Sequence, residues 1–89
     1  MIARRLIVTG RVQGVGFRFF AERAARELAV SGFVRNLPNG AVESVAEGEE
    51  DAIARYVERL REGPRMGRVT DLRVEEISVS GYRDFEITA

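Results

Sequence analysis

The stretch GRVQGVGFRFF, residues Gly10–Phe20, places three glycines within seven positions and then enters an amphipathic segment. The apolar run Leu6–Val8 precedes this stretch and is typical of a strand. After it, apolar residues recur at intervals of three and four from about residue 19 to residue 30, which predicts a helix with Gly32 as its stop signal. The chain is therefore expected to begin with a strand, a bare glycine-rich loop and a helix.

The remaining sequence predicts four more strands and a second helix. FVRNL (33–37) and AVESVA (41–46) flank the turn signal Pro38–Gly40 and indicate a hairpin. Residues 49–62 carry one apolar helical face with acidic residues at the start, and a Gly-Pro pair follows. Alternation over residues 69–79, interrupted by two adjacent glutamates, predicts a fourth strand, and FEIT at 85–88 a short last one.

The order βαββαβ plus a short C-terminal strand indicates the α+β class. We expect one domain over residues 1–89, built as a ferredoxin-like α/β sandwich. Its sheet should have five strands, mostly antiparallel, with the two helices on one face.

Composition excludes several kinds of chemistry. The chain has no histidine and no cysteine, so imidazole and thiolate metal ligands, disulfides, cysteine nucleophiles and histidine bases are all absent. The 14 basic residues balance 14 acidic ones, so no bulk positive field attracts nucleic acid. The apolar run near the N-terminus is too short for a signal peptide or a membrane span. We therefore expect a cytoplasmic monomer with no nucleic-acid or membrane partner, no cofactor and no metal.

The glycine-rich loop before the first helix is a candidate anion site. Bare backbone amides can point inward at such a turn, and the helix N-terminus adds partial positive charge, so phosphate is the expected guest. An arginine guanidinium at the helix entrance can clamp two phosphate oxygens. The spacing differs from both G-x-x-x-x-G-K-[ST] and G-x-G-x-x-G. The candidate donors are the amides of Gln13, Gly14, Val15, Gly16, Phe17 and Arg18, together with the Arg18 side chain.

A second interpretation of this loop is purely structural. Glycines also permit a tight connection between a strand and a helix, with Arg18 as a solvated residue of the first turn. Composition alone leaves both interpretations open.

Asn36 is unusual because asparagine is poorly suited to a strand. One interpretation is a local hydrogen bond that shapes the hairpin. The other is an amide that positions a water molecule or a substrate oxygen, since it both donates and accepts. Arg11 and Arg35 are interpreted as solubilising charges, Ser44 as a hydroxyl without a base, and the acidic runs AEGEED (46–51) and VEE (74–76) as a helix start and a solvated strand face.

Three motifs resemble the acylphosphatase family in order and spacing over essentially the whole chain: GRVQGVGFR (10–18), GFVRNLPNGAVE (32–43) and VAEGEE (45–50). The resemblance implies a ferredoxin-like fold and hydrolysis of an acyl phosphate to a carboxylate and inorganic phosphate, without metal, cofactor or covalent intermediate. It also implies that Arg18 and the amides of residues 13–17 hold the phosphate, and that Asn36 orients the attacking water.

Other function classes share the expected fold. The RNA-recognition domain has the same βαββαβ order, but its third strand carries stacking aromatics, and AVESVAEG (41–48) has none. A domain that binds phosphate without turnover is a second alternative, which an acyl phosphate assay distinguishes. Acylphosphatase-like domains also occur inside larger maturation enzymes that handle carbamoyl phosphate.

Overall fold

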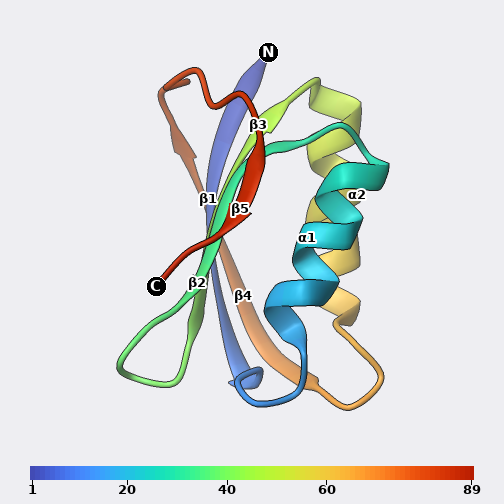
Figure 1. Ribbon diagram of the computed structural model, residues 1–89, viewed down its shortest axis with the longest axis vertical. Coiled ribbons are helices and arrows are strands. Elements are labelled where there is room, and N and C mark those ends of the chain that lie inside the picture. Colours follow the sequence, from blue (N-terminus) through green and yellow to red (C-terminus); the bar gives the residue numbers. More distant parts are fainter.

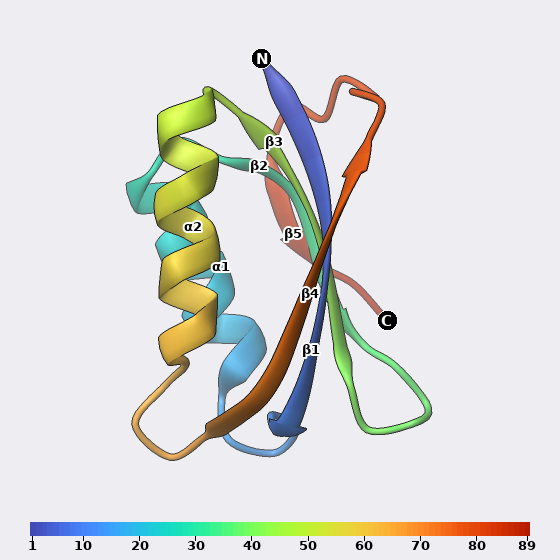
Figure 2. The ribbon, with the colours of Figure 1, turned by 180° about the vertical axis from the view of Figure 1, so that it is seen from behind.

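The computed structural model describes all residues, 1–89, and arranges them as one sheet with two helices packed against the same face (Figure 1). The view from behind shows both helices on one side of the sheet and no helix on the other side (Figure 2). The expected ferredoxin-like architecture is confirmed. The strands are β1 (Ile2–Arg11), β2 (Ser31–Asn36), β3 (Val42–Gly48), β4 (Arg68–Ile77) and β5 (Phe85–Ile87), and the helices are α1 (Phe17–Glu27) and α2 (Glu50–Glu62).

The five strands lie in the order β4-β1-β3-β2-β5. Both β1 and β2 run antiparallel to β3, β4 runs antiparallel to β1, and β5 runs parallel to β2. Because β1 and β2 run in the same direction, their C-terminal ends lie at the same end of the sheet. The start of α1 and the turn between β2 and β3 also lie at this end (Figure 1). The topology thus brings the glycine-rich loop and the β2–β3 turn to one end of the molecule.

Strand β3 is the centre of the sheet, and all seven of its residues are buried. Alternate residues of a strand point to opposite faces. Val42 and Ala46 belong to the core beneath the helices, whereas Glu43 and Glu47 point to the face without helices. The alternation of apolar and polar residues in β3 by itself suggests that the face without helices is exposed to solvent. The strand instead buries two carboxylates on that face.

Helix α1 begins two residues before the expected start and ends three residues before the expected end. Its N-cap residue Gly16 has a φ of 77°, a left-handed conformation that lets the chain turn directly into the helix. At the other end, Ala29 has a φ of 58° and the amide of Val30 donates to Ala25 O, which closes the helix before Gly32.

Gly32 is not the helix stop signal that its position suggests. It lies in β2, opposite Ala46, with a φ of 137°. A Cβ on this residue would lie 1.9 Å from the carbonyl oxygen of Val45, so at this φ any side chain would collide with the backbone of β3. The glycine is required by strand packing.

Helix α2 follows its expected pattern. Ile53, Tyr56 and Leu60 form the buried stripe, and Gly63 ends the helix with a φ of 72°. Strand β4 begins one residue before the expected start and ends two residues before the expected end, and it continues through both glutamates while paired with β1. Neither helix has the length and apolar character that crossing a membrane requires.

Candidate functional site

The glycine loop, defined here as residues 12–16, and the first turn of α1 expose a run of unused backbone donors. No amide from Gln13 to Phe19 donates a hydrogen bond within the protein, and the first helical bond comes from the amide of Phe20 to Gly16 O at 3.0 Å. Helix α1 also lacks a side-chain cap at its N-terminus. Such amides attract an anion, both as donors and as the positive end of the helix dipole.

The two inner glycines of the loop are required for backbone conformation. Gly14 has a φ of 75° and Gly16 a φ of 77°, values that side chains rarely adopt. A Cβ at either position would meet no protein atom within 4 Å. The space over the loop is therefore open at both positions.

Arg18 lies in the first turn of α1 and takes part in none of the ion pairs of the protein. This turn contains no acidic residue, whereas the first turn of α2 contains Glu50 and Asp51. A cation beside a helix N-terminus is electrostatically unfavourable without a counter-charge. The combination of free amides and an unpaired guanidinium favours a bound anion with several oxygens, such as a phosphoryl group.

Asn36 is the last residue of β2, where it pairs with Val42 of β3. Its Oδ1 atom is buried and has no hydrogen-bond partner. The hairpin bond that one interpretation assigns to this residue belongs to Asn39, whose Oδ1 accepts from the amide of Ala41 at 3.0 Å. Because a buried polar atom without a partner is costly, Asn36 is a strong candidate for contact with a water molecule or a ligand.

The side chain of Gln13 joins the glycine loop to the hairpin. Its Nε2 donates to the carbonyl oxygens of Leu37 and Ala41, both at 2.8 Å. The loop that contains the amide donors is thus tied beside the end of β2 that carries Asn36. The sequence interpretation considered only the backbone amide of Gln13. No sequence signal points to the side-chain bonds, because the acceptors are backbone atoms 24 and 28 residues away.

Arg35 is not the solubilising charge that the sequence suggests. It points to the sheet face without helices, where its Nε donates to Oε1 of Glu43 at 2.6 Å. Arg5 Nε donates to the other oxygen at 2.5 Å. Burial by itself raises the pKa of the Glu43 carboxyl, but the bonds from the two guanidinium groups outweigh burial and hold that pKa below its usual value. Arg35 therefore belongs to a separate ionic cluster.

Two other residues of β3 have structural roles. Glu47, interpreted as part of a helix start, is instead fully buried and accepts backbone amides from Ser80, Gly81 and Tyr82 at 2.5, 3.0 and 3.0 Å. The buried Ser44 hydroxyl lies 2.8 Å from Tyr56 Oη and donates to a backbone carbonyl. Burial raises the pKa of Tyr56 far above its usual range.

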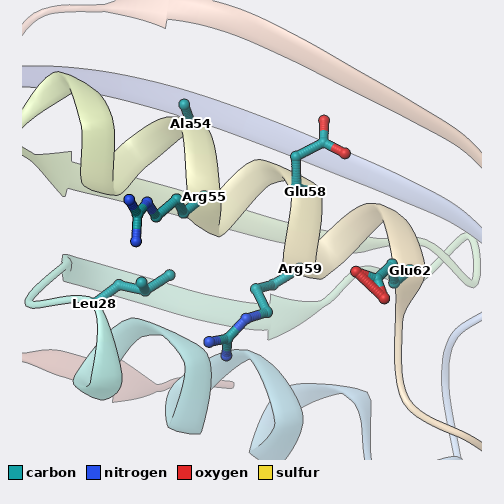
Figure 3. Close-up of a pocket in the computed structure, with 6 residues that line it drawn as sticks. All are labelled: Leu28, Ala54, Arg55, Glu58, Arg59 and Glu62. Carbon is teal, nitrogen blue, oxygen red and sulfur yellow. The ribbon is translucent and has the colours of Figure 1, made fainter.

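A groove of about 420 Å³ lies along α2, with Leu28 at the C-terminal end of α1 also lining it (Figure 3). It is lined mainly by charged residues of α2, and Arg59 bridges to Glu27 of α1 at 2.8 Å. None of the predicted site residues lines this groove. No group of three or more carboxylates that could hold a metal ion forms anywhere in the structure.

Comparisons with known proteins identify the family of the chain. A sequence model of the family described as acylphosphatase matches residues 4–87. The acylphosphatase of Archaeoglobus fulgidus is 41% identical over 87 residues, which cover 98% of each chain. The crystal structure of the Bacillus subtilis acylphosphatase superposes with a TM-score of 0.98 at 42% identity, with both chains covered completely.

A much larger protein contains a similar fold. The crystal structure of T. kodakarensis HypF matches 99% of this chain with a TM-score of 0.88 and 37% identity, but the match covers only 12% of that protein. The likeness shows that this fold also occurs as a small part of a longer chain.

Proposed function

This chain belongs to the acylphosphatase family and hydrolyses acyl phosphates to a carboxylate and inorganic phosphate, and we propose that the glycine loop, Arg18 and Asn36 perform this reaction. The observation that carries the proposal is the run of backbone amides from Gln13 to Phe19 without an acceptor in the protein. These amides, with the unpaired guanidinium of Arg18, form a phosphate cradle at the start of α1.

In the proposed mechanism, the cradle binds the three terminal oxygens of the phosphoryl group. The amides of Gln13, Gly14, Val15, Gly16, Phe17 and Arg18 donate to these oxygens, and the Arg18 fork neutralises the charge that develops on them. Phosphoryl transfer depends mainly on positioning and on such charge stabilisation, so backbone donors and one arginine suffice.

Asn36 is proposed to orient the attacking water molecule. Its side-chain amide can both donate to and accept from a water molecule, and its Oδ1 has no hydrogen-bond partner within the protein. The P–O bond to the acyl group then breaks, and its electron pair leaves with the carboxylate. Both water protons stay with the phosphate, which is released as dihydrogen phosphate.

The mechanism needs neither a general acid nor a histidine. The leaving group is a carboxylate whose conjugate acid has a pKa of about 4.3, like that of a glutamate side chain, so it departs unprotonated at neutral pH. The chain has no histidine and assembles no carboxylate cluster for a metal ion. We therefore propose that catalysis requires no metal ion.

The experiment that tests the proposed function is hydrolysis of benzoyl phosphate in excess EDTA. We expect the same kcat and KM with and without the chelator. Loss of activity in EDTA, restored by a divalent ion, contradicts the metal-free mechanism. Binding of inorganic phosphate without any turnover of benzoyl phosphate favours a phosphate-binding module instead.

We also propose that the protein acts as a cytoplasmic monomer without a nucleic-acid partner. Its exposed large apolar side chains come from separate elements, among them Phe19, Met66 and Val79, and singly exposed apolar residues require no partner. The cysteine-free sequence needs no oxidising compartment. Its net charge of zero provides no general electrostatic attraction for a nucleic acid. Size-exclusion chromatography with light scattering tests the monomeric state.

A further inference from the structure

The side-chain amide of Gln13 contacts both arms of the hairpin beside the pair formed by Asn36 and Val42. Its acceptors are the carbonyl oxygens of Leu37 and Ala41, both at 2.8 Å. Leu37 follows Asn36 directly, and Ala41 precedes Val42, the residue that pairs with Asn36 across the two strands. One amide group of the glycine loop therefore holds the backbone next to Asn36 and the backbone next to its strand partner.

The hairpin does not need Gln13 in order to close. The amide of Leu37 donates to Ala41 O at 2.8 Å, and the amide of Gly40 donates to Leu37 O at 3.1 Å. Each carbonyl oxygen has two lone pairs, so both acceptors remain satisfied when Gln13 is removed. The contribution of Gln13 is thus the connection itself, which joins two segments that no backbone hydrogen bond links.

We propose that Gln13 is a positioning residue, whose side chain fixes Asn36 at a constant separation from the phosphate cradle. The inference rests on the proposed function, because it takes the roles of Asn36 and the cradle from there. A water molecule held by Asn36 attacks productively only when its oxygen lies close to phosphorus and in line with the breaking bond, and a displacement of about 1 Å can cost a hundredfold in rate.

The proposed role has a specific kinetic consequence. The cradle keeps its backbone amides and Arg18 when the Gln13 side chain changes, so the phosphate still binds. The effect therefore falls on kcat and leaves KM and inhibition by inorganic phosphate nearly unchanged. The effect of Gln13 on kcat also requires Asn36. In a protein that lacks the Asn36 amide, the Gln13 side chain has no catalytic group to position.

The experiment is a double-mutant cycle with Gln13→Met and Asn36→Ala, assayed with benzoyl phosphate. Methionine keeps the length of the side chain but cannot donate. We expect Gln13→Met alone to lower kcat at least about tenfold, with KM and phosphate inhibition within about twofold of wild type. In the Asn36→Ala background, the same substitution should change kcat by less than about twofold.

Asn39→Ala is the matched control for a loosened hairpin. It removes the bond between Asn39 Oδ1 and the amide of Ala41 but leaves the link from Gln13 to the hairpin intact. We expect Asn39→Ala to lower the unfolding midpoint and to keep the wild-type kcat. If Asn39→Ala lowers kcat as much as Gln13→Met does, general loosening explains the effect and the proposal is overturned.

A second variant covers the case in which Gln13→Met does not fold. Gln13→Asn keeps the amide but is one methylene shorter, so it cannot span both acceptors, and we expect it to lower kcat with KM unchanged. Full kcat in the folded Gln13 variants, while Asn36→Ala has lost turnover, overturns the positioning role and leaves the proposed function intact. Multiplicative effects of Gln13→Met and Asn36→Ala also overturn it. Absence of turnover by the wild-type protein refutes the proposed function itself.

Discussion

Among single residues, Arg18 is expected to serve both substrate binding and the transition state. Its guanidinium has no carboxylate partner in the protein, so its charge is available to the phosphoryl oxygens in both states. Arg18→Ala should lower kcat/KM at least about a hundredfold and should weaken inhibition by inorganic phosphate. Arg18→Lys keeps the charge but loses the bidentate geometry of the guanidinium, so its kcat/KM should also be low. Near-normal kinetics in both variants would place the phosphate elsewhere.

Asn36 should act only when the water molecule attacks. Asn36→Ala is therefore expected to lower kcat by about a hundredfold or more while KM and phosphate inhibition change little. Because the side chain forms no hydrogen bond within the protein, its removal should barely change the free energy of unfolding. Steady-state kinetics and chemical denaturation on one preparation test both statements. Intact turnover with a stability loss of about 1 kcal/mol would instead indicate a structural hydrogen bond.

Among elements, the segment that leads into β5 depends on one buried carboxylate. Glu47 of β3 accepts three consecutive backbone amides, from Ser80 to Tyr82, and Tyr82 also packs edge-on against Phe33 at a centroid distance of 6.0 Å. Glu47→Ala should lower the free energy of unfolding by about 2 kcal/mol, since water can replace the lost acceptor at these exposed residues only in part. Hydrogen exchange should accelerate at residues 80–82.

Strand β3 provides the internal reference for this measurement. Its amides belong to the ladders with β1 and β2 and make no bond to the Glu47 carboxylate. Their exchange rates should therefore follow only the change in global stability. Unchanged protection at residues 80–82 in Glu47→Ala would show that β5 is held by its pairing with β2 alone.

Across the whole molecule, an ionic ladder joins four of the five strands on the face without helices. Arg35 of β2 and Arg5 of β1 both bind Glu43 of β3, and Arg5 also lies 3.6 Å from Glu75 of β4. The Glu43 side chain is only 5% exposed, while the side chains of Arg5 and Arg35 are 40% and 43% exposed. The ladder thus neutralises a buried charge with guanidinium groups that keep part of their hydration.

This ladder makes part of the stability depend on pH. The folded-state pKa of Glu43 lies below its ordinary value of 4.5, so its contribution is complete above that pH and is lost as the pH falls through the lower, folded-state value. Glu43→Gln should lower the free energy of unfolding by about 2 kcal/mol at pH 7, and its difference from wild type should shrink below pH 4.5. Denaturation at several pH values measures this.

Glu76→Gln is the control for the ladder. The Glu76 side chain is 86% exposed and pairs with Arg4 at 3.9 Å, so its removal should have little effect at any pH. A pH-independent difference between Glu43→Gln and wild type would contradict the role assigned to the Glu43 charge.

Local patterns in the sequence were sufficient to predict the element order and both helices, and they indicated the candidate phosphate loop. The spacing of Phe20, Ala24 and Leu28 is helical, Pro38–Gly40 forms a turn, and the glycines before Arg18 have positive φ angles. These features depend on backbone preferences within a few residues, so they are readable from the chain itself. The family resemblance then indicated which of these local features carry chemistry.

Tertiary structure alone decided which side chains meet. The acceptors of Gln13, the two arginines of Glu43 and the amides of Glu47 lie between 8 and 38 residues away in the sequence. The roles of Gly32, Arg35 and Glu47 were misjudged for the same reason, because each depends on a neighbouring strand or loop. Burial and partner choice are set when the sheet forms in its register, and a hydrogen-bond partner brought by a distant strand leaves no pattern in the local sequence.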